Sequence, residues 1–145
     1  DEKLDSVGLV DKAGAATQGF NEIKLDKKLL EELAASGTKY SSADIVSITK
    51  RADGKTIWLE NGNDSSGLKH ILNEHGTDFS NRGIIKSKVP NYLMEALNKG
   101  KIVGYQGRGT GRPIYEFTYN GTTQRVAITT GDNGYIVGAN PVSIK

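Results

Sequence analysis

The second half of this 145-residue chain contains four β-rich runs that are separated by short turn signals. The runs cover residues 101–105, 113–119, 125–130 and 135–140, and their pattern has a period of two residues. Asn120-Gly121 and Asp132-Asn133-Gly134 are typical of tight hairpin turns. Because short turns join neighbouring antiparallel strands, this half of the chain predicts a four-stranded antiparallel meander.

Helical patterns and one hairpin precede this meander. Residues 26–37 are rich in good helix formers, and the leucines at 25, 29, 30 and 33 share one face. Two β-rich runs, 45–49 and 56–60, are joined through the turn at 52–54. A further helix is predicted over 89–100, with Pro90 in its first turn and Gly100 after its end. The order favours an α+β domain with short helices and a hairpin packed on a twisted antiparallel sheet.

Residues 1–24 are small, polar and weakly periodic, so we interpret them as a linker or the end of a preceding segment. Residues 25–145 are then one domain with one core. The chain has no cysteine, which excludes disulfides and thiolate metal sites. No apolar run approaches the roughly 20 residues that a membrane-spanning helix requires.

The positive charge of the chain is concentrated in its C-terminal half. Residues 79–145 contain nine Lys or Arg and three Asp or Glu, whereas residues 1–78 contain ten and fourteen. A local excess of this kind suits a phosphate-bearing partner. It is equally compatible with a basic surface that is merely solvated.

Both histidines of the chain lie in the segment 63–76, for which a short helix is predicted. Asp64 or Ser65 is the expected N-cap, and Gly76 is expected to end the helix at His75. His75 shares the apolar stripe of Leu68, Ile71 and Leu72, whereas His70 points about 140° away around the helix. We therefore expect His75 to reach the cleft between helix and sheet.

The two histidines do not suggest a metal site. Their five-residue spacing differs from the i, i+4 pair of a metalloprotease helix, and neither Glu74 nor Asp78 offers an obvious third ligand. His75 is the better candidate for a general acid or base, because imidazole titrates near neutral pH. The alternative for each histidine is a partly buried structural role.

Metal-free RNA cleavage needs an acid and a base, cations for the phosphate, and hydroxyl or amide donors. Arg108 and Arg112 flank a glycine-rich loop, Lys86 and Lys88 lie between two predicted helices, and Arg125 shares a strand with Thr129 and Thr130. The alternative for the glycine-rich loop is a flexible hairpin tip without a binding role. The tyrosines of the meander are either base-stacking residues or half-buried sheet residues.

Several of these segments, in this order, resemble a known family. The segments are Trp58-Leu59-Glu60-Asn61-Gly62-Asn63, Gly67-Leu68-Lys69-His70-Ile71-Leu72-Asn73-Glu74-His75, Asp78-Phe79, the Pro90 helix, Gly100-Lys101-Ile102-Val103-Gly104 and Gly134-Tyr135-Ile136-Val137-Gly138-Ala139-Asn140-Pro141. Over residues 38–145 the chain resembles the C-terminal toxin domains of polymorphic toxins, including contact-dependent growth inhibition toxins. Such domains are similar to the barnase/EndoU/colicin/RelE-like ribonucleases.

This resemblance implies metal-independent RNA cleavage, often of tRNA, with no cofactor. It also implies delivery within a larger secreted or cell-surface protein, action in the cytoplasm of a target bacterium, a cognate immunity protein, and possible presentation of the RNA by a translation elongation factor. His70 and His75 match the helix motif, and Thr129 fits the hydroxyl role of the family. Arg112 and Tyr135 are assigned as catalytic by type and approximate place. The expected RNA-binding residues are Lys69, Lys86, Lys88, Arg108 and Arg125.

Two other functions stay open from the sequence. One is a metal-dependent deoxyribonuclease toxin, for which Glu60, Asp64 and Glu74 would be the acidic ligands. The other is a nucleic-acid-binding module that uses the basic meander without turnover.

Overall fold

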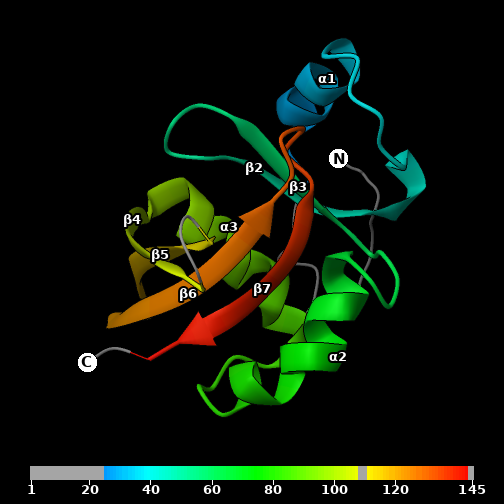
Figure 1. Cartoon of the computed structure of the whole chain (residues 1–145). Helices are drawn as coiled ribbons and strands as arrows, with labels where there is room; N and C mark the ends of the chain where they lie inside the picture. The colour runs from blue at the N-terminus through cyan, green and yellow to red at the C-terminus, as the bar shows by residue number, and fades with distance from the viewer. Residues whose placement is uncertain (1–24, 108–110, 144–145) are drawn as a thin grey trace.

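The computed structural model describes residues 25–107 and 111–143, and it confirms the α+β class (Figure 1). Within these ranges the helices are α1 (Lys27–Ala35), α2 (Gly67–Ser80) and α3 (Val89–Lys99), with short 3₁₀ helices at Ser42–Asp44 and Lys86–Lys88. The strands are β2 (Ile45–Lys50), β3 (Thr56–Glu60), β4 (Lys101–Gln106), β5 (Arg112–Tyr119), β6 (Thr122–Thr130) and β7 (Ile136–Val142).

The predicted meander forms a four-stranded antiparallel sheet with the order β4-β5-β6-β7. Asn120 and Gly121 connect β5 to β6 with φ angles of 51° and 80°. A two-residue hairpin turn with two positive φ angles matches the right-handed twist of the strands, which explains the Asn-Gly pair. The predicted hairpin of β2 and β3 forms a separate two-stranded sheet.

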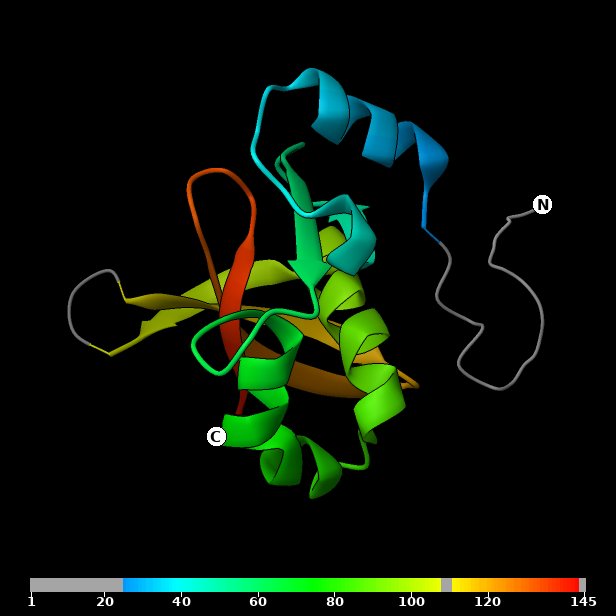
Figure 2. The same ribbon diagram turned by 90° about the vertical axis from the view of Figure 1, so that its right-hand side faces the viewer.

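Helix α3 packs against one face of the four-stranded sheet and forms the main core with it. Val126, Ile128 and Phe117 are buried on this face. The ring of Tyr92 from α3 lies 5.0 Å, centroid to centroid, from the rings of Phe117 and Tyr119 in edge-to-face geometry. The described helices leave the opposite face uncovered, and we call it the outer face (Figure 2).

Helix α2 lies along β7, the edge strand of the sheet (Figure 1). Ile71 and Phe79 anchor it in the main core, and both are fully buried. The predicted end at His75 is wrong, because Phe79 continues the apolar stripe and carries the helix through Gly76 to Ser80. The N-cap position is Ser66 rather than Asp64 or Ser65.

A second, smaller core joins α1 to the hairpin of β2 and β3. Leu33, Ile48 and Trp58 are its buried members. The Trp58 ring also contacts the ring of Tyr135 edge to face, at 5.9 Å between centroids, and the backbone N–H of Trp58 donates to the carbonyl of Gly134. The hairpin therefore fixes the loop that leads into β7.

None of the helices in residues 25–107 and 111–143 has the length and apolar character that crossing a membrane demands. The predicted linker at residues 1–24 lies outside the described residues.

Candidate functional site

The outer face of the sheet presents side chains in cross-strand rows. Thr129 on β6 pairs with Gly138 on β7, and the next row contains Ile114, Ala127 and Asn140. Residues that are directly opposite in an antiparallel pair point to the same face. Because these rows alternate with buried core residues, the polar groups of Thr129 and Asn140 face away from α3.

Arg112 begins β5 and extends across this face. Its Nη1 donates a hydrogen bond to Oδ1 of Asn140 at 2.8 Å. Since β6 lies between β5 and β7, the Arg112 side chain spans β6 to reach Asn140. Its Nη2 lies 3.2 Å from the position that a Cβ atom on Gly138 would occupy. The guanidinium therefore lies over β7, next to Gly138.

The guanidinium of Arg112 is partly buried, and among residues 25–107 and 111–143 it has no carboxylate partner. Burial lowers the pKa of Arg112, because desolvation disfavours the charged form. The ordinary pKa of arginine is so high that the group stays protonated at neutral pH. Arg112 is thus a partly desolvated cation with donors available for an anion.

His70 approaches the same place from the first turns of α2. Its Cδ2 lies 3.6 Å from the position of a Cβ on Gly138. Its Nδ1 lies 2.9 Å from the carbonyl oxygen of Asp64. Because a carbonyl only accepts hydrogen bonds, Nδ1 carries a proton, and in the neutral ring Nε2 then carries the lone pair. Nε2 is the ring atom bonded to Cδ2, the carbon that lies near Gly138.

Gly138 makes room for this arrangement. A Cβ at this position would lie between the Arg112 guanidinium and the His70 ring, closer to Nη2 than side chains normally approach. The absence of a side chain at Gly138 therefore lets Arg112 and His70 both approach β7 at this point. The Thr129 hydroxyl, opposite Gly138, makes no hydrogen bond within the described ranges.

Tyr135 reaches the start of α2 rather than the centre of the site. Its hydroxyl lies 2.9 Å from Oγ of Ser66, and it would be 3.1 Å from a Cβ on Gly67. Ser66 is the N-cap of α2, in extended conformation, four residues before His70. The Tyr135 hydroxyl therefore lies at the N-terminal end of α2, on the side of the β2–β3 hairpin.

The expectation that His75 reaches the cleft and His70 points away is reversed. The His75 ring hydrogen-bonds Asp78 on its own helix at 2.9 Å, and one third of its side chain is exposed. The apolar stripe faces the core on the α3 side of the sheet. His70 lies on the flank of α2 that meets the edge strand β7, so the residue off the stripe is the one beside the outer face.

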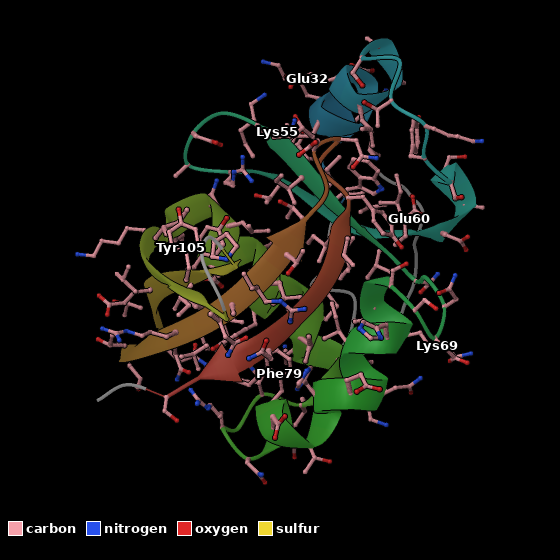
Figure 3. All side chains as sticks on the ribbon, in the orientation of Figure 1. Glu32, Lys55, Glu60, Lys69, Phe79 and Tyr105 are labelled. Carbon is pink, nitrogen blue, oxygen red and sulfur yellow. The ribbon has the colours of Figure 1, made fainter. Side chains whose placement is uncertain are left out.

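Most of the other basic residues predicted to bind RNA lie apart from this cluster. Arg125 is on the outer face but donates from Nε and Nη2 to Glu116, both at 2.9 Å. Lys69 extends from α2 away from the sheet, near Asp64 (Figure 3). Lys86 and Lys88 follow the far end of α2, in a 3₁₀ helix. Arg108 lies outside the described residues.

The acidic residues required by the deoxyribonuclease hypothesis are not brought together. The Glu60 carboxylate is buried and accepts hydrogen bonds from Trp58 Nε1 at 2.8 Å and from the Ser41 amide at 3.0 Å. Asp64 instead accepts from Asn73. In the part of the chain that the structure describes, no group of three or more His, Asp or Glu is placed to hold a metal ion.

Sequence reasoning missed Asn140, Gly138 and Ser66. Asn140 and Gly138 belong to the closing motif that carries the resemblance, but nothing in a single sequence indicates which strand faces Arg112. The signal that was available is the alternation of β7, which places Gly138 and Asn140 on one face and Ala139 on the other.

No protein-family model matches the chain, and no significant match was found among curated proteins.

Proposed function

We propose that this chain is a metal-independent endoribonuclease whose active site is the cluster of His70, Arg112 and Thr129 around Gly138. The observation that carries the proposal is their convergence from α2, β5 and β6 onto one partly exposed patch of the outer face. A histidine that can act as a base, beside a cation without a carboxylate partner, supplies two of the groups that metal-free phosphodiester cleavage needs.

In this proposal the 2′-hydroxyl of RNA attacks the adjacent phosphorus. His70 Nε2 takes the proton of the 2′-hydroxyl as the new O2′–P bond forms. Arg112 and the Thr129 hydroxyl donate to the non-bridging oxygens, where negative charge accumulates. The P–O5′ bond then breaks, and the proposed donor of the proton to the leaving oxygen is the Tyr135 hydroxyl, which lies outside the cluster at the start of α2. The products are a 2′,3′-cyclic phosphate and a 5′-hydroxyl.

The wider role that we propose follows from the resemblance described above. The chain acts as the toxin domain of a contact-dependent growth inhibition protein, cleaves tRNA in the cytoplasm of a neighbouring bacterium, and is neutralised by a cognate immunity protein. An elongation factor of the target cell is a further candidate partner. The formal charge excess of the C-terminal half supports a polyanionic substrate.

The test is cleavage of total tRNA by the purified chain, with and without EDTA. We expect discrete fragments in both conditions, and 3′ ends that resist ligation until the cyclic phosphate is opened and the resulting phosphate is removed. Cleavage that EDTA abolishes would contradict the metal-independent mechanism. Binding of tRNA without any cleavage would favour the nucleic-acid-binding module instead.

A further inference from the structure

We propose that Asn140 is a positioning residue that holds the Arg112 guanidinium in place without neutralising its charge. This inference deepens the proposed function and depends on it for the identity of the anion, which is a phosphate of RNA. The effect is to keep a fixed, partly desolvated cation ready to bind a phosphate oxygen on the outer face.

The geometry of the Asn140 amide supports this role. Arginine has only donors, so the oxygen of the amide must face Arg112, and it does so at 2.8 Å from Nη1. The amide nitrogen donates to the carbonyl oxygen of Pro141 at 3.2 Å. Both ends of the amide are therefore occupied, which fixes the orientation of the acceptor that Arg112 meets.

The chemistry of the partner matters because an amide is neutral. A carboxylate at position 140 would accept the same hydrogen bond and would cancel the charge of Arg112. It would also repel a phosphate at the same place. Arg125, on the same face, has such a carboxylate partner in Glu116. The amide at 140 thus leaves Arg112 with its full charge for a ligand.

Asn140→Asp keeps the size and the acceptor oxygen, adds a negative charge and gives up the hydrogen bond to the Pro141 carbonyl. The second variant is Asn140→Ala, which removes the acceptor. The matched control is Asn91→Asp, which makes the same charge change on α3, on the opposite side of the sheet. Asn91 is exposed, and its side chain contacts Glu95 of its own helix.

The experiment follows the Nε–H resonance of Arg112 by NMR while inorganic phosphate is added to the full chain. We expect phosphate to shift this resonance in the wild type and in Asn91→Asp with similar dissociation constants. Asn140→Asp should weaken phosphate binding about tenfold or more, while the backbone amide resonances away from position 140 stay unchanged. Asn140→Ala should weaken it several-fold and broaden the Arg112 signal, because the guanidinium loses its fixed partner.

Two results would overturn the inference: a wild-type Arg112 resonance that does not respond to phosphate, or an Asn140→Asp variant that binds phosphate as well as the wild type. Loss of folding in both variants would assign Asn140 a structural role and would also overturn it. The tRNA assay is read separately. If phosphate binding behaves as expected but the wild type cleaves no RNA, the nuclease function fails while the positioning role of Asn140 remains.

Discussion

Two arginines on the outer face of the sheet have different partners. Arg112 on β5 meets the neutral amide of Asn140, whereas Arg125 on the neighbouring strand β6 meets the carboxylate of Glu116. The Arg125–Glu116 pair is mostly shielded, with 30% and 22% of the side chains exposed, and its charges are satisfied within the chain.

The difference shows why a count of basic residues does not locate a binding site. Both arginines contribute equally to the positive excess of residues 79–145. Only Arg112 has its charge left for a ligand, since the charge of Arg125 is compensated by Glu116. The end of the outer face near α2 is therefore the part suited to bind an anion, and the end near Glu116 is suited to hold β5 and β6 together.

The largest effect that we expect separates the two ends of α2. His70→Ala should reduce single-turnover cleavage of tRNA by about 10²- to 10⁴-fold, because it removes the proposed general base beside Arg112. His75→Ala is the matched control on the same helix and should retain most of the activity. If His75→Ala were inactive and His70→Ala active, the catalytic face would be the core side of α2. If circular dichroism showed that both variants are unfolded, both rings would be structural.

The second prediction compares the removal of each of the two arginines. Arg112→Ala should lower the cleavage rate by about 10²- to 10³-fold, the effect typical of losing a preorganised donor to a developing oxyanion. Arg125→Ala should instead lower the free energy of unfolding by about 1–3 kcal/mol, because it leaves the shielded Glu116 without its partner. Urea denaturation and single-turnover rates of both variants measure the two quantities. Equal cleavage rates in the two variants would contradict the claim that Arg112, and not Arg125, serves the site.

Most of the fold was predictable from the sequence. The leucine spacing of α1, Pro90 in α3 and the Asn120-Gly121 turn are local signals, and each one fixes an element by itself. The end of α2 was not predictable in this way. Gly76 is a strong local stop signal, but burial of Phe79 overrides it, and that burial depends on tertiary packing.

The site was predictable only in its residue types. His70, Arg112 and Thr129 were all candidates, but the apolar stripe gave the wrong histidine priority. A stripe identifies the face of a helix that meets the core, whereas α2 also meets the edge of a sheet with its flank. Which flank meets the edge depends on the strand order and on the approach of α2 to β7, and neither is recorded in local spacing.

The third prediction tests how closely the Arg112 end is packed. A Cβ on Gly138 would approach Arg112 Nη2 to 3.2 Å, so Gly138→Ala should displace the guanidinium by a few tenths of an ångström and slow cleavage about tenfold. Gly104→Ala is the control on the same sheet, because its Cβ would meet Ile114 Cδ1 at an ordinary 3.9 Å. Single-turnover rates should fall only for position 138. An equal fall at both positions would mean that added volume, rather than Arg112, is responsible.

The smallest effect concerns a third arginine, Arg51, whose carboxylate partner Asp53 is exposed. Arg51 Nη2 lies 2.8 Å from Asp53 in the β2–β3 turn, and the hydrogen bonds of this pair lower the pKa of Asp53 from 3.8 to about 2. Because the folded pKa is depressed, the pair stabilises the fold fully above pH ~4, and this contribution disappears as the pH falls toward 2. With 60% of the Asp53 side chain exposed, solvent screening limits the contribution to less than about 1 kcal/mol.

Asp53→Asn should therefore be slightly less stable than the wild type in urea at pH 6 and equally stable near pH 2, with unchanged cleavage at neutral pH. A difference in stability that persists at low pH would show that the side chain acts through packing, and a loss of cleavage would mean that an arginine with a carboxylate partner also serves the site.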